Sequence, residues 1–264
     1  MSQPLHPTVP ATPRGETGQP TLKTDTARVL MAAALLAGCT AGTLASWGGL
    51  GLGYFFKAAV LLGLFAALMW HGLFAPPATL HPHARFGAAN RVTLLRLGMT
   101  ALLAALLGET LSTAAWRNVV VVATASASFD AVDGWLARRS GLASAFGARF
   151  DMESDAAFTL VLSALVFQSG QVGVWVLASG LMRYAFVAAA RRWPWLAGPL
   201  RPSRRRQTAC VVQIATLIAS LSPAVPPALA AVLAATSLAL LAWSFAVDVR
   251  HLHRARPAPT PPET

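Results

Sequence analysis

Four aspartates gather within one stretch of the sequence, and their spacing suits a site that holds metal ions. Asp130 and Asp133 are three residues apart, and Asp151 and Asp155 are four apart, so each pair should lie on one face of a helix. The turn-forming segment 139–144 separates the pairs and predicts that two helices meet at a polar end. Oxygen ligands without a nearby His or Cys favour Mg²⁺ or Mn²⁺ and leave Ca²⁺ open. Two such ions roughly 3.5–4 Å apart would suit in-line displacement at phosphorus.

The same carboxylates have a plainer interpretation. Arg138, Arg139 and Arg149 lie in the same segment and could pair with the aspartates as a salt-bridge cluster at the helix ends. Ionisable groups within a membrane span are costly, however, and usually serve a function. Whether the aspartates lie at a membrane therefore matters for the choice between the two interpretations.

The composition indicates a membrane protein. Of the 264 residues, 55% are hydrophobic and only 12% are charged, whereas about 25% charged residues are typical of soluble domains. The net charge of +11 would suit a nucleic-acid-binding protein, but the apolar content is too high for that class, so we expect no nucleic-acid partner. Because a span needs about 20 mainly apolar residues, we expect an all-α, polytopic membrane helix bundle. Eight stretches approach that pattern: 29–50, 54–75, 92–107, 115–138, 150–168, 171–191, 207–222 and 226–247.

The distribution of Lys and Arg predicts the topology. Basic residues precede the first and third stretches, follow the fourth and the eighth, and fill the segment between the sixth and the seventh. Because cytosolic loops carry the excess of Lys and Arg, both chain ends and the aspartates should face the cytosol. Lys57, near the first outer turn, is the one exception. The polar end segments 1–27 and 254–264 are expected to be disordered tails.

From Asp130 to Asp155 the sequence reads D-x2-D-G-x2-A-R-x8-G-x3-D-x3-D, with every fixed position filled. This pattern resembles the signature of the CDP-alcohol phosphatidyltransferase family. The resemblance implies a six-span integral membrane enzyme that transfers a phosphatidyl group from CDP-diacylglycerol to an alcohol and releases CMP. It implies a catalytic core over residues 79–253 and leaves two extra N-terminal spans, residues 28–78, outside the family pattern. We expect this N-terminal hairpin to be dispensable.

The resemblance also implies a role for each matched residue. Asp130, Asp133, Asp151 and Asp155 would bind two divalent cations, Mg²⁺ or Mn²⁺. Asp155 would in addition be the catalytic base that takes the proton from the attacking hydroxyl. Three small residues would line the CDP pocket and one arginine would contact the diphosphate, namely Gly134, Ala137, Gly147 and Arg138.

Two flanking segments also resemble the family. Asn90, Thr93 and Arg96 are spaced by three residues and could face the nucleotide, with helix capping and a snorkelling arginine as the alternative. Segment 203–213 resembles the basic opening of the fifth core helix, which could bind an acceptor phosphate or anchor the protein to anionic lipid. The candidates for contacting an acceptor phosphate are Arg96, Arg149, Arg183, Arg204, Arg205 and Thr208.

The motif determines the donor chemistry but not the acceptor. The basic segment 201–206 favours a phosphorylated alcohol, and glycerol-3-phosphate is our first choice, with inositol phosphate, serine or choline as alternatives. A divalent-cation transporter is a further alternative, but it would need acids through the membrane, and none is found beyond Glu109 at the outer end. The resemblance further implies a homodimer. We expect it in the bacterial inner membrane, with the active site facing the cytosol.

Overall fold

The computed structural model describes residues 18–48, 50–74, 83, 85–140, 144–200 and 203–255, and this part of the chain is helical, without strands. The predicted all-α fold is confirmed for these residues. Each predicted apolar stretch contains one α-helix or most of one, and the stretch 171–191 also contains a 3-10 helix before its α-helix. The helices are α1 (Gly18–Gly48), α2 (Leu52–Phe74), α3 (Ala88–Ala105), α4 (Thr113–Ser140), α5 (Ala145–Gln168), α6 (Leu177–Arg192), α7 (Arg204–Ser220) and α8 (Pro227–Arg254), with short 3-10 helices η2 (Val174–Val176) and η3 (Pro194–Ala197).

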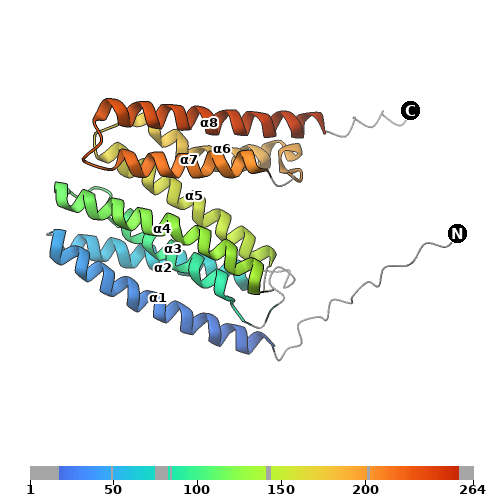
Figure 1. Ribbon diagram of the computed structural model, residues 1–264. Helices are drawn as coiled ribbons and strands as arrows, with labels where there is room; N and C mark the ends of the chain where they lie inside the picture. The colour runs from blue at the N-terminus through green and yellow to red at the C-terminus, as the bar shows by residue number, and fades with distance from the viewer. Residues whose placement is uncertain are drawn as a thin grey trace, which may run out of the picture.

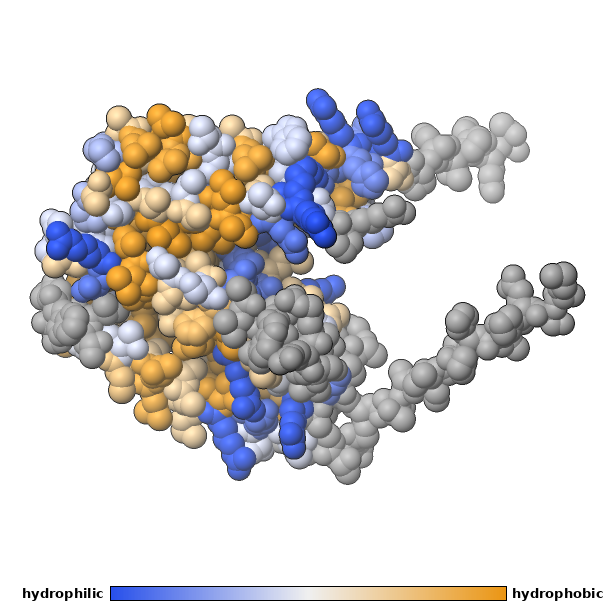
Figure 2. All heavy atoms as spheres, viewed as in Figure 1, coloured by the Kyte–Doolittle hydropathy of each residue, from blue (hydrophilic) through white to orange (hydrophobic). Residues whose placement is uncertain are grey.

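Two of these helices, α2 and α8, are long and apolar enough to cross a membrane by length and composition. Others are shorter: α6 has 16 residues and α7 has 17, whereas a span needs about 20. Large apolar side chains are nevertheless exposed on most helices, and Figure 2 shows them over much of one side of the bundle. Such an apolar surface suits contact with lipid. The number of eight spans stays a prediction.

The first helix begins earlier than predicted. Residues 18–27, the last part of the predicted tail 1–27, belong to α1. Leu22 and Thr26 are fully buried there, at 0% exposure, and Leu22 belongs to the same buried cluster as Phe86 of the predicted core. Tertiary contacts therefore hold a segment that has no apolar run of its own. Residues 1–17 and 256–264, which make up most of both predicted tails, lie outside the described part.

The helices form two groups that share α5. On one side, α1 and α2 pack against the hairpin of α3 and α4; on the other, α6 and η3 pack with the hairpin of α7 and α8. Helix α5 contacts α3 in the first group and α6 and α7 in the second (Figure 1). Figure 2 shows a hollow between the two groups on the side where α5 begins. The shared helix thus carries its N-terminal half into this hollow.

Local sequence explains how the ends of α3 and α5 are placed. Ser144 has an extended backbone, and its Oγ accepts the Gly147 N–H at 3.0 Å, which caps the N-terminus of α5. The turn after α3 contains Gly108 with a φ of 82°, a left-handed conformation that glycine adopts without strain. Ser144 thus sets where α5 begins beside the hollow, and Gly108 lets the chain turn after α3 at the opposite end.

A polar cluster ties the helices together at the end opposite to the aspartates. Lys57 Nζ lies 2.6 Å from Glu109 Oε1 and donates to the Leu107 carbonyl at 2.9 Å. Gln168, the last residue of α5, donates to the Glu109 carbonyl at 3.0 Å and accepts the Gly108 N–H at 2.7 Å. Lys57, the exception in the predicted topology, is therefore neutralised by an acid from the turn after α3.

The N-terminal hairpin shares its buried surface with the predicted core. Tyr54 of α2 is fully buried and donates its hydroxyl to the Leu102 carbonyl of α3 at 3.5 Å. Leu73 of α2 belongs to the same buried cluster as Phe86, Leu94 and the start of α5. These contacts argue against the expectation that residues 28–78 are dispensable.

Candidate functional site

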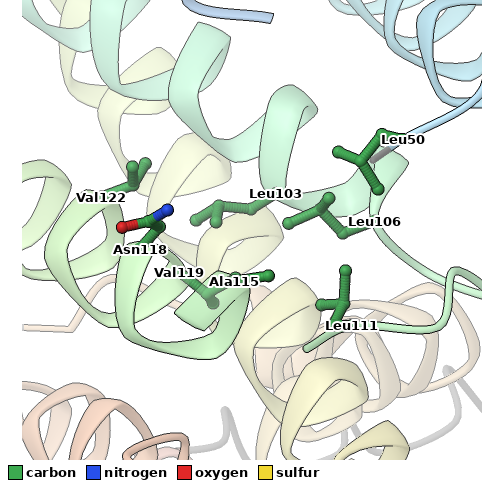
Figure 3. A pocket seen from close by; sticks show the side chains of 8 residues that line it. All are labelled: Leu50, Leu103, Leu106, Leu111, Ala115, Asn118, Val119 and Val122. Atoms are coloured by element: carbon green, nitrogen blue, oxygen red, sulfur yellow. The ribbon is translucent and has the colours of Figure 1, made fainter. Parts of the chain in front are cut away.

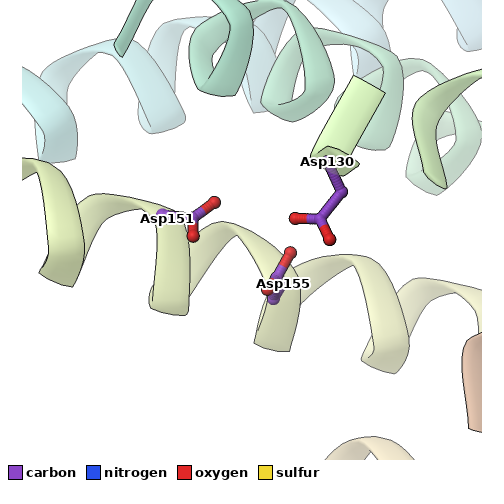
Figure 4. Close-up of side chains that lie close together, drawn as sticks. All are labelled: Asp130, Asp151 and Asp155. Carbon is purple, nitrogen blue, oxygen red and sulfur yellow. The ribbon is translucent and has the colours of Figure 1, made fainter. Parts of the chain in front are cut away.

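Three of the predicted metal-binding aspartates meet where α4 faces α5. Asp130 comes from α4, while Asp151 and Asp155 lie one turn apart on α5, and the three carboxylates point toward one another (Figure 4). An oxygen from each lies within 4.8 Å of the others. The side chains are 39–44% exposed, so water and solutes can reach them. Asp133 belongs to residues 131–140, whose side chains lie outside the described part.

Arg96 of α3 brings a positive charge into this cluster. Its Nη1 lies 2.9 Å from Asp130 and 3.0 Å from Asp151, and its Nη2 lies 2.5 Å from Asp155. Its Nε donates to the Ser126 carbonyl of α4 at 3.3 Å. The residue is only 2% exposed, so the guanidinium is held inside the bundle. One buried side chain thereby joins α3, α4 and α5.

The site has features of both interpretations that the sequence left open. A salt-bridge cluster is present, and the arginine described at its centre comes from α3. Arg149 of the motif segment is exposed, and the side chains of Arg138 and Arg139 lie outside the described part. Among the described ion pairs, three carboxylates surround the one guanidinium of Arg96. Their oxygen atoms are close enough together, and hard enough as donors, to hold Mg²⁺ or Mn²⁺. The donor set therefore fits a hard cation, and metal binding stays a prediction.

The predicted nucleotide residues lie beside the aspartates at the starts of α3 and α5. Asn90 and Thr93 are buried, and the Thr93 hydroxyl donates to the Ala89 carbonyl at 3.2 Å. A Cβ on Gly147 would lie 2.8 Å from Asn90 Oδ1. A glycine at this position therefore avoids a clash with Asn90, in addition to leaving space for the nucleotide as the sequence predicts. Gly134, Ala137 and Arg138 belong to residues 131–140, for which only the helical backbone is described.

The candidates for phosphate contact fall into separate environments. Arg183 of α6 forms an ion pair with Glu153 of α5. Arg205 of α7 lies 2.5 Å from Asp248 of α8 and also donates to the Ser244 carbonyl. Arg96 belongs to the aspartate cluster described above. The remaining candidates, Arg149, Arg204 and Thr208, are exposed.

Sequence reasoning missed the acidic partners Glu153 and Asp248. Glu153 lies between two metal candidates, and Arg183 within an apolar stretch requires an anionic partner, so the sequence carried a signal for this pair. Asp248 could also have been predicted as a partner for the basic start of α7, because it is the only acid in the sequence between Asp155 and Glu263. The pairing of Arg96 with the aspartates could have been expected in the same way, because Arg96 also lies within an apolar stretch and needs an anionic partner.

An apolar pocket lies at the opposite end of the α3–α4 hairpin, between Leu50, Leu106 and Val122 (Figure 3). Its lining contains one polar side chain, Asn118, and no titratable group. Val122 precedes Asp130 by eight residues of helix, which separates them by about 12 Å. This pocket lacks the groups needed for chemistry on a phosphate, so the aspartate cluster remains the candidate site.

Comparison with known proteins identifies the family of the chain. Residues 86–247 match the family model described as CDP-alcohol phosphatidyltransferase. The match covers more than half of the chain and includes the three aspartates and Arg96. No match was found among curated proteins or among solved structures. The chain therefore belongs to the CDP-alcohol phosphatidyltransferase family and is a transferase of that family.

Proposed function

We propose that the protein transfers a phosphatidyl group from CDP-diacylglycerol to an alcohol and releases CMP. The observation that carries the proposal is the convergence of Asp130, Asp151 and Asp155 within the segment that matches the family. The polar site opens beside helix surfaces that expose apolar side chains. CDP-diacylglycerol suits this arrangement, because its CDP group is polar and its two acyl chains are apolar.

Two divalent cations are proposed at the aspartates. Asp130, Asp133, Asp151 and Asp155 would be their ligands, because carboxylate oxygens are the donors that Mg²⁺ and Mn²⁺ prefer. When bound, such ions supply positive charge that stabilises the phosphoryl oxygens and acidifies the attacking alcohol. Arg96 contributes a fixed positive charge from the buried side of the cluster.

The proposed reaction exchanges one bond at the phosphatidyl phosphorus. The alcohol oxygen forms a bond to phosphorus, and the bond from phosphorus to the bridging oxygen breaks, so that CMP leaves with the electron pair. Asp155 would take the proton of the alcohol. By match to the family motif, Gly134, Ala137 and Gly147 would border the CDP group, and Arg138 would contact the diphosphate.

Glycerol-3-phosphate is the proposed acceptor. Arg183 and Arg205 lie on α6 and α7, which pack against α5 on the side away from α3. Their pairing with Glu153 and Asp248 orients each guanidinium, and a guanidinium has five N–H donors, so some remain for a phosphate. Inositol phosphate, serine and choline would undergo the same chemistry at phosphorus and are the alternatives to test.

We also propose that the protein is an integral homodimer of the bacterial inner membrane with its site toward the cytosol. Helix α1 begins and α8 ends on the same side of the bundle as the end of α4 (Figure 1). The basic residues Arg204, Arg205 and Arg206 begin α7 and would face the cytosol with this end.

CMP release by the purified full chain in detergent tests the function. CDP-diacylglycerol, Mg²⁺ or Mn²⁺ and a panel of alcohols are supplied, and we expect CMP release that EDTA abolishes. Asp155→Asn should lose turnover while its thermal unfolding stays close to wild type. No CMP with any acceptor would contradict the proposal, and Mn²⁺ uptake into vesicles in that case would favour the transporter alternative. An active Asp155→Asn variant would contradict the assignment of the base alone.

A further inference from the structure

We propose that Asp25 is a positioning residue for the nucleotide end of the active site. Asp25 is the one acidic residue of α1, and α1 lies outside the segment that matches the family, which begins at Phe86. The inference rests on the proposed function, because it concerns the binding of the CDP-linked donor. It assigns a part in the reaction to a helix that the family pattern does not include.

The Asp25 carboxylate holds the backbone where α3 begins. One oxygen accepts the Phe86 N–H at 3.0 Å, and the other accepts from the Arg91 guanidinium at 2.9 Å. The N-cap of α3 is Gly87, which has a φ of 89° and makes no side-chain cap. Negative charge near a helix N-terminus is favoured by the helix dipole. Helix α1 thus supplies a charge that the sequence around the start of α3 does not.

Phe86 connects the Asp25 carboxylate to the residues that we expect beside the bound nucleotide. Its carbonyl accepts the Asn90 amide at 2.5 Å, and the Asn90 oxygen lies 2.8 Å from the place of a Cβ on Gly147. Its ring centroid lies 6.5 Å from those of both Phe146 and Phe150, which flank Gly147 on α5. A shift of Phe86 would therefore move the Asn90 amide and the first turn of α5 together.

This placement predicts an effect on the donor more than on the acceptor. Helix α1 packs on α2, α3 and α4, whereas the acceptor candidates Arg183 and Arg205 lie on α6 and α7. The polar contact matters because apolar burial contributes little to helix association in lipid, so specific hydrogen bonds and packing set the helix positions. Asp25 is therefore expected to act on the edge of the site formed by α3 and α5.

Steady-state kinetics of the purified full chain test the inference. Asp25→Ala should raise the KM for CDP-diacylglycerol about tenfold, the scale seen for residues that orient a binding group, and leave the acceptor KM within about twofold. Asp25→Asn keeps an oxygen for the Phe86 N–H but loses the charge beside Arg91, so we expect a smaller rise. Should the alanine variant not fold, the asparagine variant decides.

Lys57→Met is the matched control, because it breaks the ion pair that joins the N-terminal hairpin to Glu109 at the opposite end. This variant should unfold at a lower temperature but keep the wild-type donor KM. An unchanged donor KM in both Asp25 variants, or an equal rise in Lys57→Met, would overturn the inference.

A wild-type protein that releases no CMP would contradict the proposed function instead. In that case hydrogen exchange decides the positioning role. Amides 86–91 and 146–150 should exchange faster in Asp25→Ala than in Lys57→Met, and equal rates would overturn the role.

Discussion

Charge balance around Arg96 decides what the aspartate site can bind. Asp130, Asp151 and Asp155 share one guanidinium that is 2% exposed, while the carboxylates remain 39–44% exposed. The arginine stays buried only because it is paired, since an isolated buried charge is strongly unfavourable. The carboxylates can turn toward solvent. A cation would thus compete with Arg96 for oxygen atoms, and the site can be stable with either positive partner.

Arg96→Ala tests this balance. We expect the variant to unfold at a lower temperature than wild type in EDTA, because three carboxylates lose their described countercharge. Mn²⁺ should recover a larger share of the thermal stability in the variant than it adds to wild type, which differential scanning fluorimetry in detergent can measure. Asp155→Asn is the control, since it removes a carboxylate and should weaken the response to Mn²⁺. The hypothesis is contradicted if Mn²⁺ shifts the two proteins equally.

The pair of Arg183 and Glu153 allows a test of the acceptor. Arg183→Met should raise the KM for glycerol-3-phosphate on the order of tenfold or more, because a hydrogen bond between charged groups is lost. Glu153→Gln keeps Arg183 and frees its guanidinium, so the acceptor KM should not rise. Initial rates at saturating CDP-diacylglycerol measure both. If Glu153→Gln raises the KM as much as Arg183→Met does, the pair is structural and the phosphate role is wrong.

At the scale of elements, apolar runs predicted which segments are helices but not where the helices end. Helix α3 begins at Ala88, four residues before its predicted apolar stretch, and Asn90 lies in that extension. Helix α5 begins at Ala145 and not at residue 150, because Ser144 caps it. Hydropathy marks the part of a helix that contacts lipid or core, whereas backbone hydrogen bonds and caps extend it. Functional residues at the polar ends therefore need motif spacing to be found.

Helices α5 and α6 approach each other closely at Gly180. This contact sets the position of α6, which carries the acceptor candidate Arg183, relative to α5. A Cβ on Gly180 would lie 2.4 Å from the Leu160 Cα and 2.7 Å from the Ser163 Oγ. Because backbone blocks it, the helices would have to separate. We expect Gly180→Ala to lower the free energy of unfolding by roughly 1–3 kcal/mol, measured by thermal or denaturant unfolding in detergent.

Gly63→Ala is the matched control for that prediction. Gly63 lies inside α2, and a Cβ there would meet no atom within 4 Å. Alanine has the higher helix propensity, so this variant should be as stable as wild type or more so. Equal destabilisation by both substitutions would mean that the close approach of α5 to α6 does not limit the packing.

At the scale of the whole molecule, the pairs that join distant helices were the least predictable feature. The motif predicted that Asp130 and Asp151 would meet, because both residues belong to it and both share helix faces with other aspartates. Arg96 and Lys57 gave only the general expectation that a charge near lipid needs a partner, and Asp25 belongs to a segment that was predicted to be a disordered tail. Which partner each one finds depends on how α3 packs with α4 and α5 and on how α1 and α2 pack on α3, and periodicity along one helix carries no information on that packing.

Removal of the N-terminal hairpin tests how far the family segment depends on it. Lipid can replace the apolar contacts of α1 and α2, since acyl chains are as apolar as the buried leucines. It cannot replace the polar ones, in which Asp25 binds Phe86 and Arg91 and Lys57 binds Glu109. We therefore expect a chain lacking residues 1–78 to insert in the membrane but to release CMP at least about tenfold more slowly than wild type.

Supplying the hairpin as a separate chain distinguishes lost contacts from lost insertion. Residues 1–78 co-expressed with the truncated chain should restore CMP release, because the polar contacts act between helices and do not need the covalent link. The same fragment with Asp25→Ala should restore less, while the fragment with Lys57→Met should restore a less heat-stable enzyme with the wild-type donor KM. A truncated chain with full activity would show that the site on α3, α4 and α5 keeps its geometry without α1.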